Sequence, residues 1–194
     1  MTAYRHNKIK LISFLLILTV VLGIIIYNTV HLALQTVYPL KYSELVEKYS
    51  AEYNLDEAFV YAVIETESGF NKDAVSEVGA RGLMQIMPDT FKWLKSKTGE
   101  KLPDDALFEP EVSIRYGCFL LRYLLDEFEN EKTALAAYHA GVGRVKKWLR
   151  DPEYSDDGKT VARIPYETTK NYTEKVMKTY HRYIKLYDLT EAQQ

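Results

Sequence analysis

The sequence is poor in cysteine. Cys118 is the only cysteine among 194 residues, so no disulfide can form within the chain. It lies in the apolar run "RYGCFLLRYLL", where it is most simply a small core residue of a helix and not a catalytic thiol. The folded part of the protein must therefore rest on apolar packing instead of covalent cross-links.

The sequence also lacks an excess of positive charge. The formal net charge is -2 at pH 7, so nothing in the charge balance indicates nucleic-acid binding. The glycine-containing segment "GARGLMQIMP" (Gly79–Pro88) has neither the lysine nor the following serine or threonine of a phosphate-binding loop. We expect no metal and no other cofactor, because no metal-ligand spacing relates the four histidines, His6, His31, His139 and His181.

Charge is missing altogether from residues 11–40. The core of this stretch, "LISFLLILTVVLGIIIY" (Leu11–Tyr27), is apolar on all sides, and its extension to residue 34 is long enough to cross a bilayer. A core helix of a soluble domain would show an apolar stripe instead. The sequence therefore predicts a transmembrane anchor at residues 11–34, with a cleaved signal peptide as the alternative.

Three basic residues, Arg5, Lys8 and Lys10, precede this stretch and no acidic residue accompanies them. Positive residues beside a span favour the cytoplasmic side. We expect a basic cytoplasmic amino terminus at residues 1–10, a single-pass anchor, a linker at residues 35–42 and a body on the outer side of the membrane.

The body, residues 43–187, shows helical apolar spacing almost throughout and no alternating strand of useful length. We expect an all-α fold of six or seven helices, followed by a tail at residues 188–194. The expected helices cover residues 43–54, 57–68, 90–98, 111–128, 131–139, 144–150 and 166–187.

Residues typical of helix starts and helix ends support these boundaries. Ser43 and Asp56 are expected to cap the first two helices of the body, because their side chains can accept hydrogen bonds from backbone N–H groups. Gly69 is expected to end the second helix, and Gly141 and Gly143 to break the chain after residue 139.

Two glutamates close the helix "EAFVYAVIETES", and helical spacing separates them. Glu67 continues the apolar face of Val60, Val63 and Ile64, whereas Glu65 points elsewhere and should be solvated. Desolvation and the negative end of the helix dipole should both raise the pKa of Glu67. A carboxyl group that stays protonated near neutral pH can act as the general acid in glycosidic cleavage.

The run "ETESGFNKDAVSEVGARGLMQIMPDTF" closely resembles the signature of the soluble lytic transglycosylase (SLT) family, which is lysozyme-like and cleaves peptidoglycan. "ALAAYHAGVGRVKKWL" resembles the family's Ala-Tyr-Asn-Ala-Gly-x-Gly motif. "IPYETTKNYTEKV" resembles its Ile-Pro-aromatic-x-Glu-Thr-x-x-Tyr motif. The three blocks occur in the family's order and cover roughly residues 42–186.

The resemblance implies that Glu67 is the catalytic acid and base. It implies that Ser76, Gln85 and Met87 line the sugar site and that Tyr138 lies close to the catalytic glutamate. Two positions depart from the family pattern. His139 replaces the usual asparagine, and Thr168 occupies the place of a glutamate. Whether Thr168 or the neighbouring Glu167 makes the expected substrate contact stays open.

The implied activity is that of a lyase on bacterial peptidoglycan glycan strands. It would cleave the β-1,4 bond between N-acetylmuramic acid and N-acetylglucosamine and form a 1,6-anhydro end. One carboxylate suffices because the attacking C6 hydroxyl is tethered within the substrate. Two alternatives are a lysozyme-type hydrolase, with Asp73 or Glu77 as a second acid, and a non-catalytic tethered glycan-binding protein. The sequence does not identify a partner in cell-wall or secretion machinery.

Overall fold

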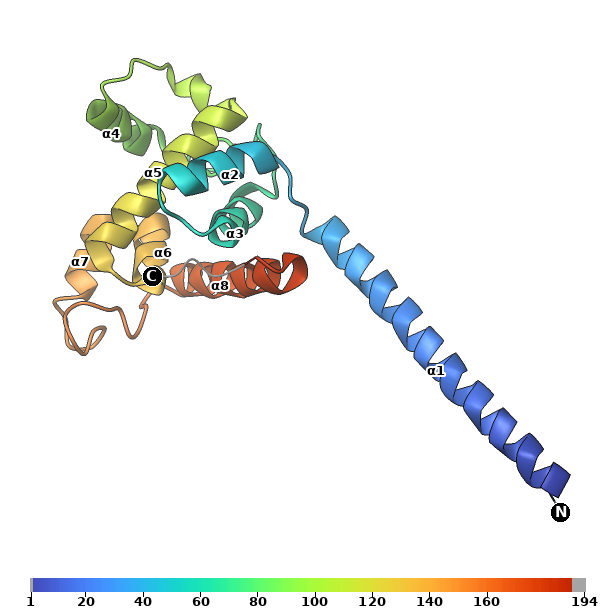
Figure 1. Ribbon diagram of the computed structural model, residues 1–194. Coiled ribbons are helices and arrows are strands. Elements are labelled where there is room, and N and C mark those ends of the chain that lie inside the picture. Colours follow the sequence, from blue (N-terminus) through green and yellow to red (C-terminus); the bar gives the residue numbers. More distant parts are fainter. Residues whose placement is uncertain (1, 190–194) are drawn as a thin grey trace. The chain divides into compact units, whose positions relative to one another are not determined.

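The computed structural model describes the backbone of residues 2–189 and the side chains of residues 14–189 (Figure 1). The chain divides into two compact units, residues 1–39 and residues 40–194. The described residues form α1 (Thr2–Val37), α2 (Ser43–Glu52), α3 (Glu57–Ser68), α4 (Pro88–Thr98), the 3-10 helix η1 (Asp104–Phe108), α5 (Pro110–Phe128), α6 (Glu131–Ala140), α7 (Val142–Trp148) and α8 (Glu167–Tyr187).

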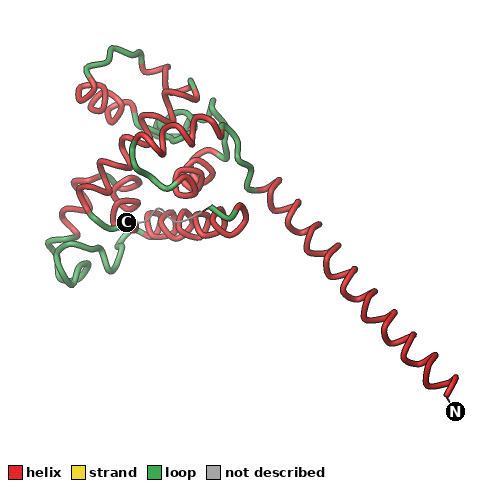
Figure 2. The backbone as a smooth tube through the Cα atoms, viewed as in Figure 1, coloured by secondary structure: helices red, strands yellow, loops and turns green. Residues whose placement is uncertain are grey.

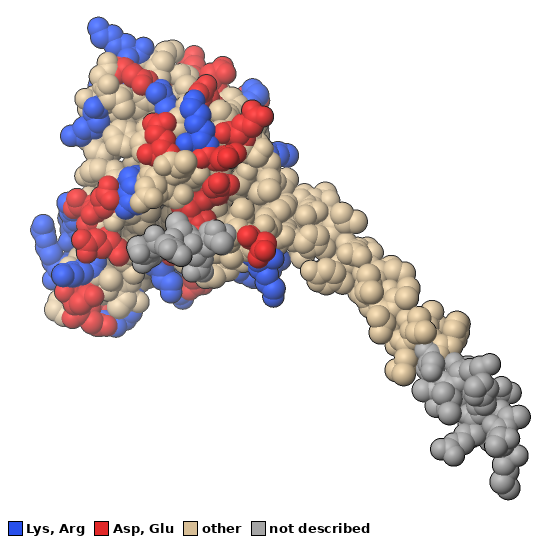
Figure 3. All heavy atoms as spheres, viewed as in Figure 1, with Lys and Arg blue, Asp and Glu red and all other residues tan. Residues whose placement is uncertain are grey.

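The first unit is one helix, α1. Its segment Phe14–Val37 covers 24 residues with a mean hydropathy of 2.2, so length and composition allow it to cross a membrane. Its large apolar side chains are exposed, and no charged group interrupts the described part of its surface (Figure 3). The helix ends at Val37, two residues before Pro39, and so runs three residues into the predicted linker.

The second unit is all-α, as expected. Figure 2 shows no strand in its described residues. Seven α-helices belong to the described part of this unit, at the upper limit of the expected number. Helix α3 lies at its centre, and every residue from Ala58 to Ile64 is buried. The long helix α8 packs along α3, while α6 bridges α5 and α8.

Helix ends follow the predictions in part. Asp56 caps α3 by accepting from the Ala58 N–H at 2.8 Å, and Gly69 ends the helix in the left-handed conformation. Ser43 does not cap α2. It is the first helical residue, and Tyr42, at φ 58°, occupies the cap position without a side-chain hydrogen bond. Gly143 does not break the chain, because it lies inside α7.

Residues 70–87 are irregular and form a compact loop between α3 and α4. Two isolated bridges, Val75 with Arg81 and Arg81 with Ile86, fold the loop back on itself. Gly82 is required at its position, because a Cβ there would lie 1.9 Å from the Leu107 carbonyl oxygen and φ is +74°. This glycine therefore allows close approach to the protein's own backbone and not to a ligand.

Two expectations differ in detail from the structure. The segment between Pro103 and Pro110, expected as a loop, contains the helix η1. Helix α4 begins at Pro88, which suits the first turn because its missing N–H would have no helical partner there. Of the predicted tail, residues 190–194 lie outside the described residues.

Candidate active site

Glu67 lies in the last turn of α3, where α8 packs against it. The Tyr172 hydroxyl, from α8, donates a hydrogen bond to Glu67 Oε1 at 2.7 Å. The two residues are 105 positions apart in the sequence, so this contact exists only because α3 and α8 pack side by side. Glu67 is thus held at the carboxyl end of one helix by a donor from another.

The pKa of Glu67 is raised from 4.5 to about 7. Desolvation by burial is the largest cause, and it outweighs two opposing effects, the hydrogen bond from Tyr172 and the positive charge of Lys175. Among the described residues, no carboxylate contributes to this shift. The group can therefore carry a proton near neutral pH without a second acid beside it.

Glu65 is not the solvated residue that helical spacing predicted. It is partly buried, and burial raises its pKa as well, while Lys175 and Lys41 lower it. The physical reason is that α3 is buried on all sides: Tyr61, on the Glu65 side of the helix, is 1% exposed. The sequence pattern implied that α3 has one buried face, but α3 is a central helix and is buried on more than one face.

Two hydrogen bonds connect the loop that follows α3 to the site, and they are accepted by the carbonyl groups of consecutive loop residues. The Ser68 hydroxyl donates to the Leu83 carbonyl oxygen at 2.8 Å. The Tyr138 hydroxyl, from α6, donates to the Met84 carbonyl oxygen at 2.6 Å. Burial and the nearby charge of Glu67 both raise the pKa of Tyr138, so it remains a hydroxyl donor. The effect of Glu67 on its pKa places Tyr138 near Glu67.

The other loop residues that the sequence predicted serve mainly the loop itself. Ser76 Oγ accepts from the Ala80 N–H at 2.9 Å. Gln85, at φ 46°, donates through Nε2 to the Ala74 and Gly82 carbonyl oxygens. Within the part of the chain that the structure describes, no donor is recorded for the amide oxygen of Gln85. Met87 is 38% exposed, so its side chain is open to solvent.

His139 contacts two residues of α8, Tyr172 and Thr169. Its ring centre is 4.6 Å from that of Tyr172, with the planes tilted by 31°. Its Nδ1 lies 3.1 Å from Thr169 Oγ1. Burial lowers the pKa of His139, so the imidazole is neutral near pH 7. The residue that replaces the family's asparagine therefore supports the residue that binds Glu67.

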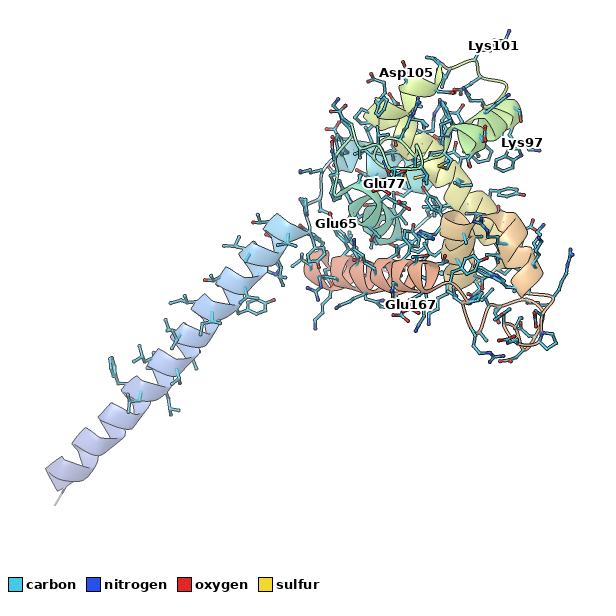
Figure 4. All side chains as sticks on the ribbon, turned by 180° about the vertical axis from the view of Figure 1, so that it is seen from behind. Glu65, Glu77, Lys97, Lys101, Asp105 and Glu167 are labelled. Carbon is cyan, nitrogen blue, oxygen red and sulfur yellow. The ribbon has the colours of Figure 1, made fainter. Side chains whose placement is uncertain are left out.

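Neither candidate for the downstream glutamate role is engaged in a strong contact. Thr168 is exposed. Glu167 begins α8, its side chain is 73% exposed, and its carboxylate lies 4.0 Å from the Lys170 ammonium. Figure 4 shows Glu167 at one end of α8, apart from Glu65 and Glu77. Among the described residues, no hydrogen bond or ion pair joins Glu167 to Glu67, and the choice between Thr168 and Glu167 stays a prediction.

A pocket of about 430 Å³ opens beside Tyr138, between α4, α5 and the junction of α6 with α7. A larger one, of about 980 Å³, is lined from the α2–α3 turn, α5, α6 and α8, and none of the expected site residues lines it. Within the described residues no group of three His, Cys, Asp or Glu side chains is arranged to hold a metal ion.

Sequence reasoning missed three residues of this site: Tyr172, Ser68 and Thr169. Tyr172 is the tyrosine that closes the third motif, so the pattern carried a signal for it. Ser68 follows Glu67 directly in the first motif. Their functions could not be assigned, because the hydrogen bonds that define them join segments that only the tertiary fold brings together.

Comparison with known proteins identifies the family. The Transglycosylase SLT domain family matches residues 44–161. Soluble lytic murein transglycosylase of Escherichia coli (strain K12) is 35% identical over 153 residues, which cover 75% of this chain and 24% of the relative. Membrane-bound lytic murein transglycosylase C of Mannheimia succiniciproducens is 33% identical over 129 residues, which cover 59% of this chain and 36% of the relative.

Solved structures of lytic transglycosylases are also similar to this chain. Lytic transglycosylase Slt of Pseudomonas aeruginosa, solved as an inactive glutamate-to-glutamine mutant, superposes with a TM-score of 0.71 at 31% identity, covering 82% of this chain and 26% of that one. The 70-kDa soluble lytic transglycosylase in complex with bulgecin A superposes with a TM-score of 0.70 at 28% identity, covering 83% and 27%.

The chain therefore belongs to the Transglycosylase SLT domain family, and the predicted lysozyme-like all-α fold is confirmed. It spans 24% of the length of the Escherichia coli relative.

Proposed function

We propose that this protein is a peptidoglycan lytic transglycosylase with Glu67 as its single catalytic acid and base. It would cleave the β-1,4 bond between N-acetylmuramic acid and N-acetylglucosamine and leave a 1,6-anhydromuramic acid end. One observation carries the proposal: a glutamate of an SLT domain has its pKa raised to about 7 by burial, so that it can both give and take a proton near neutral pH, and it accepts a hydrogen bond from Tyr172.

In the first step, the Glu67 carboxyl group donates its proton to the oxygen of the glycosidic bond, and the bond to the muramic acid C1 breaks. The bonding electron pair leaves with the N-acetylglucosamine oxygen, which becomes a hydroxyl group, and a positive charge stays on the muramic acid. The Glu67 carboxylate that forms is stabilised by the Tyr172 hydroxyl and by the charge of Lys175, the two groups that lower its pKa. Burial therefore favours the protonated form of Glu67, while Tyr172 and Lys175 favour the carboxylate. Because these effects oppose each other, Glu67 can both release and regain the proton.

In the second step, the Glu67 carboxylate accepts the proton of the muramic acid C6 hydroxyl, whose oxygen bonds to C1. The hydroxyl belongs to the same sugar ring, so the ring closure gains from proximity and needs no held water. Glu67 regains its proton and is ready for another cycle. Most glycosidases need a second carboxylate, and none contributes to the Glu67 pKa among the described residues.

The relatives support this assignment. The curated relatives are soluble and membrane-bound lytic murein transglycosylases. The Pseudomonas aeruginosa structure is of a mutant made inactive by a glutamate-to-glutamine change. We assign the corresponding role here to Glu67, since it is the glutamate of the Glu-Ser pair with the perturbed pKa.

We assign substrate contacts to predicted site residues whose side chains are exposed or have a hydrogen-bonding atom without a partner in the described residues. We assign glycan contacts to Met87 through its exposed side chain, to Gln85 through its amide oxygen, and to Ser76 through its hydroxyl hydrogen. Tyr138 holds the loop and forms part of the cleft wall. Glu167 is assigned a contact farther along the strand, where its exposed carboxylate can accept sugar hydroxyl groups.

The principal alternative is a lysozyme-type hydrolase on the same fold. Its second acid would be Asp73, which is exposed and paired with Lys72 at 2.9 Å, or Glu77, which is exposed on the same loop. Neither contributes to the pKa of Glu67. A non-catalytic glycan-binding protein would have no use for a carboxyl group tuned in this way.

Product analysis tests the function. Peptidoglycan digested with the full-length protein should give muropeptides with anhydro ends by mass spectrometry. Products heavier by one water, with reducing ends, would establish the hydrolase instead. Binding of glycan without any cleavage by the wild-type protein would establish the non-catalytic alternative.

The location of the protein is a separate part of the proposal. We assign residues 11–34, within α1, as a single-pass anchor in the bacterial cell membrane, with the basic residues Arg5, Lys8 and Lys10 in the cytoplasm and the second unit on the wall side. Protease added to intact spheroplasts should then degrade the second unit. Protection of that unit until the membrane is disrupted would contradict the orientation.

A further inference from the structure

The solvent-facing side of α8 carries a row of positive charges toward the carboxyl end of the helix. The row, called the cationic stripe here, consists of Lys175, Lys178, Arg182 and Lys185. Their spacing of three, four and three residues places all four within about 80° of the helix circumference, because each residue turns an α-helix by about 100°. The three lysines are exposed, and Arg182 is partly exposed. The stripe is therefore a continuous surface of one helix.

Few acidic groups balance the stripe. From residue 174 to residue 185, four basic residues face one acid, the exposed Glu174. The ion pair recorded for α8 among the described residues joins Lys170 to Glu167, in the first turn of the helix and away from the stripe. The stripe thus presents a net positive charge to its surroundings.

The opposite side of α8 is occupied by the protein itself. Apolar residues such as Val176 and Tyr183 are fully buried, and α8 packs along α3. The helix therefore has no apolar face to insert into a bilayer, as an interfacial amphipathic helix would. A partner of the stripe must be held at the surface by charge.

The stripe begins close to the segment that joins the two units. Lys175 and Lys41 both lower the pKa of Glu65, so their ammonium groups lie near the same carboxylate. Lys41 is exposed and follows the end of α1, Val37, by four residues. Four residues extend at most about 14 Å. A membrane crossed by α1 is therefore within reach of Lys41.

An anionic lipid surface matches these features. Clusters of Lys and Arg on a helix are attracted to anionic phospholipid headgroups. The attraction acts over roughly one Debye length, about 8 Å at physiological salt, so it requires the membrane to be near. The chain itself supplies that nearness through the anchor, which it does not do for a dissolved anionic partner.

We propose that the cationic stripe and Lys41 form a docking surface for the anionic phospholipid headgroups of the membrane that α1 anchors. The contact adds a second attachment to the covalent one and so fixes which side of the second unit faces the membrane. The inference rests on the anchor assigned to residues 11–34 and does not depend on glycan cleavage.

Chemical labelling of lysines measures the docking directly. The full-length wild-type protein is placed in bilayer nanodiscs of phosphatidylcholine, or of phosphatidylcholine with about one third phosphatidylglycerol. A water-soluble reagent acylates exposed lysines, and mass spectrometry quantifies each site. Labelling of Lys178 and Lys185 should fall at least about threefold in the anionic nanodiscs. High salt should remove this protection, because it screens the charges.

Lys97 and Lys101 are internal controls in the same molecule. Both are exposed, and Figure 4 shows them at α4 and the loop after it, away from α8. Their labelling should be equal in the two kinds of nanodisc. The ratio of stripe labelling to control labelling also cancels differences in the amount of protein or reagent.

Charge reversal tests whether the stripe acts as one surface. Lys178→Glu combined with Lys185→Glu should abolish the protection of Lys41 by anionic lipid. Lys97→Glu combined with Lys101→Glu changes the net charge equally and should leave that protection intact. Thermal melting verifies that both double variants are folded.

Equal labelling of the stripe in the two kinds of nanodisc would overturn the docking surface, as would protection that survives high salt. Protection that arises only when peptidoglycan fragments are added to phosphatidylcholine nanodiscs would assign the stripe to the wall and would also overturn it. Failure of the anchor is recognised separately by the spheroplast experiment, and failure of the proposed activity by the product analysis.

Discussion

Glu65 and Glu67 lie two residues apart in the last turns of α3, and both have raised pKa values because both are partly buried. What differs is the set of groups around them. Glu67 receives the Tyr172 hydroxyl at 2.7 Å, and its pKa reaches about 7. Glu65 is influenced by two lysine charges, Lys175 and Lys41.

If Glu67 is the catalytic acid, as proposed, this difference means that burial alone does not make a glutamate one. Burial supplies the proton near neutral pH, because it disfavours the carboxylate. A donor such as Tyr172 then makes the carboxylate usable once the proton has left. Only Glu67 combines the two, and the predictions below test that combination, beginning with the largest effect.

Glu67→Gln should abolish release of anhydro muropeptides, with a loss of at least about 1000-fold, because the side chain can neither donate nor accept the transferred proton. Loss of product with retained thermal unfolding would agree with the assignment. Activity within a factor of ten of wild type would show that another residue is the acid.

The same variant carries a stability prediction. The pKa of Glu67 is about 7 in the folded state against 4.5 for the free side chain, so its stabilising contribution is full below pH 4.5 and is lost as pH rises through 7. The loss amounts to about 3 kcal/mol. Glutamine does not titrate, so Glu67→Gln should gain stability relative to wild type between pH 4 and pH 8. Denaturant unfolding at both pH values measures the difference, and a constant difference would contradict the raised pKa.

Tyr172→Phe should reduce kcat about tenfold at neutral pH, because the Glu67 carboxylate loses its hydrogen bond. That hydrogen bond lowers the pKa of Glu67, so its removal should raise the pKa further and move the alkaline decline of activity to higher pH. A pH–rate profile of both proteins checks the direction. A decline that moves to lower pH would mean that Tyr172 does not act on Glu67 as the geometry indicates.

The sequence was sufficient for the class of fold and most helix positions, and it led to the choice of Glu67, which stays a prediction. Apolar spacing and the family motifs carry that information along the chain. It was not sufficient for the environment of Glu65, since only the packed structure shows that α3 is buried on all sides. The prediction that Ser43 caps α2 was wrong for a related reason. Tyr42 occupies the cap position in a left-handed conformation, and no local sequence pattern indicated this.

Contacts between distant segments were the least predictable. Tyr172 reaches Glu67 across 105 residues, and His139 reaches Thr169 across 30. A sequence motif identifies such residues, but it does not show which side chains are in contact in the folded protein. The partner of Glu67 therefore had to come from the packing of α8 against α3.

His139 should have a smaller effect than Tyr172, because it touches Tyr172 and not the carboxylate. His139→Ala removes the ring contact and the Thr169 hydrogen bond, and should lower kcat about threefold with little change in KM. His139→Asn keeps a polar group that can reach Thr169 and should restore most of the rate. Equal losses in the two variants would show that the imidazole itself is required.

Glu65→Gln should have the smallest effect and gives the comparison its sharpest form. The change keeps the size of the side chain and removes a carboxylate that shares the last turns of α3 and the influence of Lys175 with Glu67. If Tyr172 distinguishes the two glutamates, kcat/KM should stay within about twofold of wild type, which is less than about 0.5 kcal/mol. The measurement is the rate of anhydro muropeptide release at pH 6 and pH 8. A loss comparable to that of Glu67→Gln would mean that the enzyme uses two carboxylates and that the single-acid mechanism is wrong.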